Sequence, residues 1–106
     1  MNPDEQPIVR PGRLTLTATY EGEGTLHGGR GGSQRVVSLI DVRRGDHIIA
    51  TDEIVPFTTE LGSLNLQKGM VLQFVASVTF RRVKDGYYYY MSRHAKFRVL
   101  PPPKGG

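Results

Sequence analysis

Five β-rich stretches, each bounded by turn-forming residues, dominate the hydrophobic pattern of the chain. The first, fourth and fifth alternate apolar and polar residues with the two-residue period of a strand that has one buried face. No stretch of ten or more residues has convincing helical periodicity. In order, the predicted strands are Arg13–Tyr20, Arg35–Val42, His47–Val55, Met70–Phe80 and Tyr87–Val99.

The last two stretches read as a hairpin, because a basic turn that ends in Asp85-Gly86 separates them. In the fourth stretch the even positions from Leu72 to Phe80 are apolar, and in the fifth the odd positions are mostly apolar. The opposite face of the fifth stretch then offers tyrosines, a histidine and two cations, which is the chemistry used to stack bases and neutralise phosphates. These residues are Tyr88, Tyr90, His94, Lys96 and Arg98.

The connection Glu21–Gln34 contains six glycines, which forbid a stable helix and predict a mobile loop. The loop lacks the Gly-Lys-Ser/Thr ending of a phosphate-binding P-loop. Arg30, between two glycine pairs, is typical either of an arginine–glycine nucleic-acid segment or of a plain hairpin tip. In the first case Arg30, His27 and Arg35 would fold over a bound strand.

The two remaining connections are shorter. Arg43–Asp46 is a tight turn whose glycine and aspartate are needed for backbone reasons, so its Arg-Gly-Asp tripeptide does not indicate adhesion. Arg43 and Arg44 matter more as charges near a binding region. Pro56–Gly69 leaves room for one helical turn at most, and its leucines are expected to plug one end of the sheet.

The length of 106 residues predicts one domain with a modest core. We expect a disordered lead over residues 1–12, a β-barrel domain over 13–100 and a Pro/Gly tail over 101–106. The chain has no cysteine, no signal-like N-terminus and no apolar run that could cross a bilayer. The expected location is therefore the cytoplasm, without a membrane partner.

Charge is distributed unevenly along the chain. Residues 1–67 carry six Lys/Arg and nine Asp/Glu, whereas residues 68–106 carry eight Lys/Arg and a single Asp. The C-terminal part has a net charge of +7, which suits a polyanionic partner or simply solubilises an exposed hairpin.

Five strands with these connections favour a small closed barrel, since an open sheet would leave edges unpaired. From Arg13 to Val99 the chain resembles an OB-fold, the five-stranded Greek-key barrel of many nucleic-acid-binding proteins. The resemblance lies in the strand order, the Gly-rich first connection, the segment Leu64–Gly69 and the strand Val71–Val78 that follows it. The second and third strands lack the aromatic residues of the usual stacking platform.

The resemblance implies a ligand groove across the second and third strands, flanked by the loops Glu21–Gln34 and Arg81–Gly86. A single strand threaded there would meet cations for its phosphates and rings for its bases, with weak sequence preference. The loops would contribute His27, Arg30, Arg81, Arg82 and Lys84, with Tyr87 and Tyr88 at the rim.

Each of these features has a second interpretation. Tyr88 and Tyr90 are expected either to stack on a ligand or to pack against cross-strand neighbours or another subunit. The row of His94, Lys96 and Arg98 also fits a solvated sheet face.

The first hypothesis is a non-catalytic protein that binds single-stranded nucleic acid, with DNA favoured over RNA. The alternative is an assembly module, in which the same hairpin contacts another protein or, in a homo-oligomer, a second copy of the chain.

Catalysis has little support in the sequence. The three histidines His27, His47 and His94 lie in different predicted elements, without the spacing of metal ligands. Asp52 and Glu53 are adjacent on a strand and point to opposite faces. We therefore expect no enzymatic activity, no metal and no cofactor.

Overall fold

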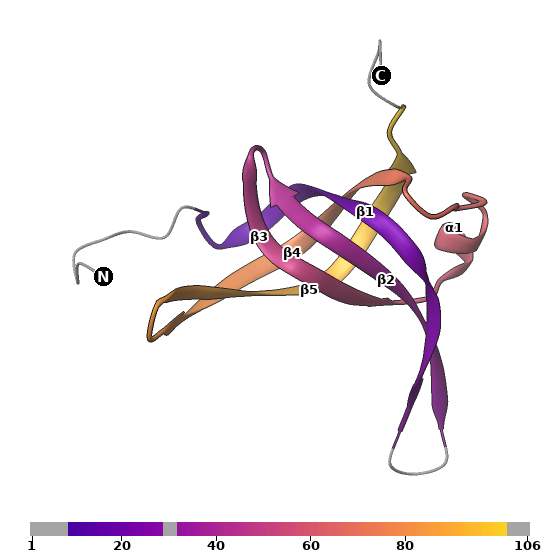
Figure 1. Ribbon diagram of the computed structural model, residues 1–106, viewed down its shortest axis with the longest axis horizontal. Coiled ribbons are helices and arrows are strands. Elements are labelled where there is room, and N and C mark those ends of the chain that lie inside the picture. The colour runs from indigo at the N-terminus through magenta and orange to yellow at the C-terminus, as the bar shows by residue number, and fades with distance from the viewer. Residues whose placement is uncertain (1–8, 29–31, 102–106) are drawn as a thin grey trace.

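The computed structural model describes residues 9–28 and 32–101, and within them the chain is almost entirely β-structure. Five antiparallel strands form one sheet, and one short helix lies between the third and fourth strands. In chain order the elements are β1 (Gly12–His27), β2 (Ser33–Arg44), β3 (His47–Pro56), α1 (Thr59–Gly62), β4 (Val71–Val83) and β5 (Gly86–Val99) (Figure 1). The predicted all-β class and the five predicted strands are confirmed.

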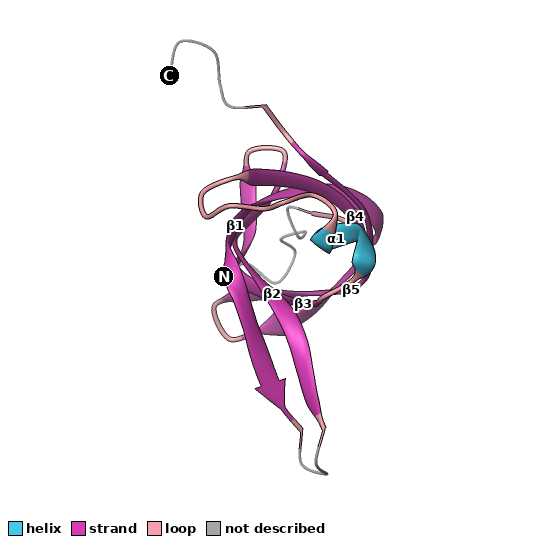
Figure 2. Cartoon of the chain, turned by 90° about the vertical axis from the view of Figure 1, so that its right-hand side faces the viewer, coloured by secondary structure: helices cyan, strands magenta, loops and turns pink. Residues whose placement is uncertain are grey.

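The strand order is β3-β2-β1-β4-β5, so β1 lies in the middle of the sheet and pairs with both β2 and β4. Seen end-on, the strands curve into a ring, with α1 at the end that faces the viewer (Figure 2). Among the described residues no backbone pairing joins β3 to β5. These two edge strands are linked by side chains instead, since His94 Nε2 lies 3.1 Å from Glu53 Oε2.

The inner face of the curved sheet forms the core. Alternate residues of β1 and β4 are buried, as their hydrophobic pattern predicted. Phe74 is completely buried, and its ring stacks on Phe97 with 5.4 Å between the ring centroids. The buried cluster consists of Val9, Leu16, Ala18, Tyr20, Val37, Leu39, Val42, Ile49, Val55, Leu61, Leu72, Phe74, Ala76, Val78 and Phe97.

The helix α1 is a single turn, as expected for the segment between the third and fourth strands. Thr58 caps it, because its Oγ1 accepts a hydrogen bond of 3.2 Å from the backbone N–H of Leu61. Leu61 is buried, and Leu64 and Leu66 pack against the core, so the predicted leucine plug is confirmed. No helix in the described part of the chain is long and apolar enough to span a membrane.

The alternation of β5 is interrupted twice. Relative to β4, the register of β5 gains one residue between Ser92 and Ala95 and another between Ala95 and Arg98. Arg93 and Lys96 have φ values of 54° and 57°, the left-handed conformation typical of residues in bulges. The sequence predicted unbroken alternation from Tyr87 to Val99, and this prediction is wrong between the two bulges, where His94 turns inward and Ala95 lies opposite the outer Val75. The second bulge restores the predicted faces, so Phe97 is buried and Arg98 is exposed.

The Gly-rich connection is also different from the prediction. Most of Glu21–Gln34 is an extension of β1 and β2, which pair as far as His27 and Ser33 and form a twisted ribbon that projects from the ring (Figure 1). Glycine disfavours a helix but permits the strong twist of an isolated two-stranded ribbon. Arg30 lies outside the described residues.

Residues 1–12 are predicted to form a disordered lead, but Val9 packs against the domain. This side chain is buried, and its backbone N–H donates a hydrogen bond of 3.2 Å to the Tyr89 hydroxyl. The strand β1 then begins at Gly12. At the other end, β5 stops at Val99, as predicted, and the backbone N–H of Leu100 donates a hydrogen bond of 2.8 Å to the Val71 carbonyl. Residues 1–8 and 102–106 lie outside the described part of the chain.

Replacing Phe74 by alanine is expected to lower the free energy of unfolding by about 3–5 kcal/mol, because a cavity would remain against Phe97. Urea unfolding followed by circular dichroism measures this change. The control is Tyr88→Ala, which also removes a ring from the β4–β5 hairpin but from an exposed position. A similar loss in both variants would contradict the assignment of the core.

Candidate nucleic-acid interface

The β4–β5 hairpin sorts its cations and tyrosines onto two faces. Residues directly opposite each other in an antiparallel pair share a face. The pairs Arg81–Tyr88 and Thr79–Tyr90 therefore lie on the outer face, whereas Arg82–Tyr87 and Phe80–Tyr89 lie on the side of the core. The four consecutive tyrosines thus divide equally between the two sides.

The tyrosines on the core side are packed against protein. Phe80 makes edge-to-face contacts with Tyr87 and Tyr89, with ring centroids 5.1 Å and 6.3 Å apart. The Tyr89 hydroxyl also accepts the hydrogen bond from Val9. These rings extend the core along the hairpin, which limits what they can offer a ligand.

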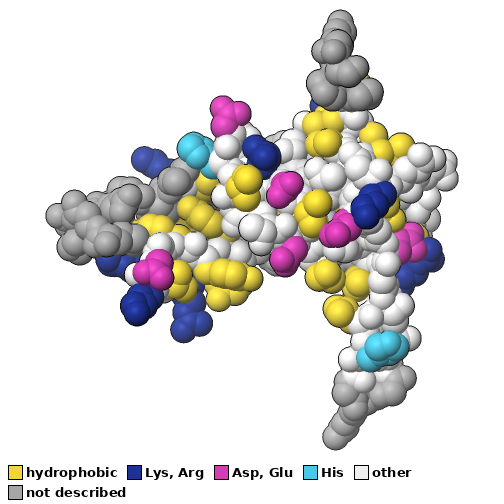
Figure 3. All heavy atoms as spheres, in the orientation of Figure 1, with side chains coloured by type: hydrophobic (Ala, Val, Ile, Leu, Met, Phe, Trp, Pro, Cys, Tyr) yellow, Lys and Arg dark blue, Asp and Glu magenta, His cyan; other side chains and the backbone are white. Residues whose placement is uncertain are grey.

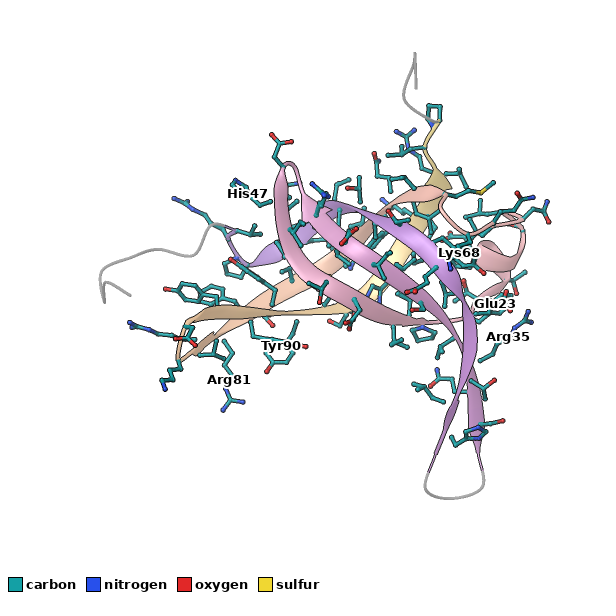
Figure 4. The ribbon with its side chains drawn as sticks, in the orientation of Figure 1. Glu23, Arg35, His47, Lys68, Arg81 and Tyr90 are labelled. Carbon is teal, nitrogen blue, oxygen red and sulfur yellow. The ribbon has the colours of Figure 1, made fainter. Side chains whose placement is uncertain are left out.

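The outer face carries the chemistry of a stacking site. Tyr88 and Tyr90 are 57% and 46% exposed, and their ring centroids are 4.7 Å apart. Figure 4 shows Arg81 and Tyr90 extending from the same side of the hairpin. Arg81 is exposed opposite Tyr88, so a cation and two tyrosine rings stand together on one surface. We call Arg81, Tyr88 and Tyr90 the outer tyrosine face.

Further cations lie at the hairpin tip, where Arg82 is on the side opposite the outer tyrosine face. Arg82 and Lys84 are exposed there, next to Asp85. Arg13 also lies on the outer side, opposite Ser77, but its Nη1 donates hydrogen bonds to Ser77 Oγ and to the Arg93 carbonyl, at 3.2 Å and 2.7 Å. Arg13 therefore serves mainly to hold the bulge at Arg93.

The ribbon and the hairpin do not form one groove. The start of β1 at Gly12 pairs with Val78 near the hairpin, whereas its far end at His27 pairs with β2 (Figure 1). His27 is exposed on the ribbon, at the opposite end of β1 from the outer tyrosine face. The predicted grouping of the two loops around one ligand is therefore not observed for the described residues.

Arg35 is engaged in contacts within the protein. Its Nη2 lies 2.6 Å from Glu23 Oε2, and its guanidinium carbon lies 3.9 Å from the centroid of the Phe57 ring. Beside this ion pair, burial raises the pKa of the Tyr20 phenol, and the Glu23 carboxylate adds to the rise while Arg35 opposes it. The arginine thus stabilises the base of the ribbon.

Arg43 and Arg44 are exposed at the end of β2, before the turn into β3. Arg44 Nη1 donates a hydrogen bond of 3.0 Å to the Thr15 carbonyl, and Arg43 lies opposite Thr17 and Ile48. Neither residue is part of the outer tyrosine face.

His94 lies between the two edge strands, where the bulge at Arg93 turns it away from the outer face. Its side chain is 9% exposed, its ring is 5.9 Å from that of Phe74, and its Nε2 contacts Glu53. The predicted cationic row with Lys96 and Arg98 is therefore not formed. Arg98 and Lys96 remain exposed, and Arg98 Nη2 donates to Gln73 Oε1 at 3.4 Å.

We call the line of contact between the edge strands β3 and β5 the seam. A small pocket of about 190 Å³ lies along it. It is lined by Val55, Pro56, Thr58, Arg93, His94 and Phe97. Next to it, Glu60 Oε1 of α1 accepts a hydrogen bond of 3.1 Å from the backbone N–H of Phe97. The polar groups of the seam are thus largely used to join β5 to β3 and α1.

The outer face of β2 and β3 differs in chemistry from the hairpin. Ser38 pairs with Ile54, and Ile40 pairs with Asp52, while the intervening Leu39 is buried. This part of the surface has no aromatic ring, as the sequence indicated for these strands, and the cation on the same face, Arg43, lies farther along β2 opposite Ile48. The usual stacking platform of an OB-fold has no counterpart here.

Sequence reasoning missed the pairing of Arg81 with Tyr88 and the inward position of His94. The first follows from the hairpin register, in which Lys84 and Asp85 form the turn and Val83 lies opposite Gly86; a turn centred on Asp85-Gly86 would have placed Arg81 opposite Tyr90 instead. Within residues 9–28 and 32–101, no group of three or more His, Asp or Glu side chains is placed to hold a metal ion.

Comparison with known proteins does not assign the chain to a family. No protein-family model, curated protein or solved structure matches it. Its function is therefore inferred from the side chains and their geometry.

Replacing Glu53 by alanine is expected to lower the free energy of unfolding by about 1–3 kcal/mol, because the largely buried His94 ring loses its partner. Glu23→Ala is the matched control. It removes a carboxylate from an exposed ion pair, where the expected loss is about 1 kcal/mol or less. Chemical denaturation compares the two variants, and a smaller loss for Glu53→Ala would contradict a stabilising role for the seam.

Proposed function

We propose that this protein binds single-stranded nucleic acid without catalysis, with DNA favoured over RNA and with little sequence preference. The observation that carries the proposal is the outer tyrosine face, where two exposed rings stand beside an exposed arginine. Bases stack on such rings whatever their identity, and each stacked base contributes about 1–3 kcal/mol.

The positive charge of the hairpin supports the same surface as the binding site. The part of the chain that contains the hairpin has a net charge of +7, and Arg81, Arg82 and Lys84 are all exposed there. Arg81 would neutralise a phosphate beside the stacked bases, Arg82 and Lys84 would add to the positive potential of the hairpin tip, and binding would weaken as salt increases. Because the rings rather than base-edge hydrogen bonds make the contact, sequence preference would be weak.

An OB-like Greek-key barrel is part of the proposal. The order β3-β2-β1-β4-β5 becomes a closed barrel if β3 adjoins β5, and the Glu53–His94 contact supports that closure. The binding mode would differ from the one that the resemblance implies. The ligand would lie on the hairpin, because exposed tyrosine rings and cations occur together there, whereas the outer face of β2 and β3 carries Arg43 but no tyrosine or phenylalanine.

Tyr88→Ala is expected to weaken binding of fluorescein-labelled poly-dT about tenfold, because one stacking surface is lost. Fluorescence anisotropy at low and moderate salt measures the affinity. The chemically matched comparison is Tyr89→Phe, which keeps a ring on the opposite side of the same hairpin and should bind as the unaltered protein does. Equal affinity of the Tyr88→Ala variant would contradict the proposed stacking site.

Arg81→Glu is expected to lower the affinity and to reduce the slope of log affinity against log salt, because a phosphate contact is lost. Lys68→Glu makes the same change in charge at the far end of the molecule (Figure 4). If both variants weaken binding equally, the effect is one of net charge and the hairpin is not the site.

A further inference from the structure

The outer face of β2 has a strip of very small residues beside it. On β1, Gly22 lies opposite Ser38 and Gly24 lies opposite Val36. A Cβ atom added to Gly22 would meet no atom within 4 Å. The backbone is therefore bare at this position, and a flat ring from another molecule can approach it closely.

Aliphatic and acidic side chains border this strip. Ile54 is 42% exposed opposite Ser38, and the exposed Asp52 lies opposite the half-buried Ile40. In Figure 3, acidic and hydrophobic side chains occur together over β2 and β3. We call Gly22, Ser38, Ile40, Asp52 and Ile54 the acidic face.

The same chain carries a surface that complements the acidic face. Tyr88, Tyr90 and Val83 expose apolar area on the β4–β5 hairpin, and Arg81 supplies the opposite charge. Aromatic residues and arginine are the residues that most often anchor protein interfaces. The hairpin projects from the ring (Figure 1). The acidic face is open at Gly22, where an added Cβ would meet no atom within 4 Å.

These two surfaces cannot meet within one molecule, because both lie on the outside of the same curved sheet and on different strand pairs. We propose that the outer tyrosine face of one copy docks on the acidic face of a second copy. The tyrosine rings would cover the glycine strip and Ile54, and Arg81 would pair with Asp52 of the next copy. Since the two surfaces differ, the contact repeats head to tail and produces open chains or rings.

This assembly goes beyond nucleic-acid binding and does not depend on it. If both occur, they use the same rings, so an oligonucleotide competes with the second copy for Tyr88 and Tyr90. The competition would couple the size of the assembly to the amount of single-stranded nucleic acid present.

Light scattering during size exclusion, over a range of protein concentrations at low salt, tests the assembly with the full chain. The average mass of the unaltered protein is expected to rise with concentration. Asp52→Lys should raise the concentration needed for association about tenfold, because it replaces an attraction with a repulsion. Asp52 is exposed and accepts a hydrogen bond of 3.5 Å from the Thr51 hydroxyl, so the variant should fold, which circular dichroism verifies.

Asp46→Lys is the control, since Asp46 is an exposed acid in the turn between β2 and β3, away from the acidic face. It should associate as the unaltered protein does. Mixing Asp52→Lys with Arg81→Glu offers a second test, because every contact between unlike variants joins opposite charges. The mixture should form assemblies in which the two variants alternate and which neither variant forms alone, and recovery of these mixed assemblies supports the contact.

The proposal is overturned if the unaltered protein stays monomeric over the whole range, or if Asp46→Lys weakens association as much as Asp52→Lys. Poly-dT binding by dilute Asp52→Lys is measured in parallel, because this variant keeps the outer tyrosine face. Binding without association overturns only the assembly. Association without binding overturns only the proposed nucleic-acid function.

Discussion

The inner face of the sheet must be closed to water although its two edge strands share no backbone pairing in the described residues. Side chains accomplish this closure. The Phe74–Phe97 stack fills the space beneath the seam, His94 contacts Glu53 across it, and Glu60 binds the backbone of β5 from α1. The curvature of the whole sheet, and hence the direction of every outward side chain, depends on these few contacts.

Once the sheet is curved, alternation decides what each face can do. The hairpin must place half of its consecutive tyrosines outside, and it places them next to Arg81. Tyr87 and Tyr89 on the other side pack with Phe80 and stabilise the projecting strands. The exposed rings are thus held on a rigid support, which lowers the entropy lost when a partner binds them.

Two surfaces of opposite character result from this arrangement. The hairpin is cationic and aromatic, whereas the acidic face carries Asp52 between aliphatic side chains and is partly bare of side chains. Under the two proposals, a nucleic acid would bind the first surface, and a second copy would use both. Both proposals therefore depend on the same two residues, Tyr88 and Tyr90.

Hydrophobic pattern alone predicted the five strands, the buried faces of β1 and β4, the leucine plug and the basic character of the hairpin. Each of these depends on residues close together in the chain, so local spacing and composition suffice. Register depends on the partner strand, and only the tertiary structure decided it. Pairing extended β1 and β2 into the Gly-rich connection, and bulges at Arg93 and Lys96 turned His94 inward to Glu53. Because one inserted residue reverses the faces until a second insertion restores them, the sequence period of β5 could not show that His94 lies inside.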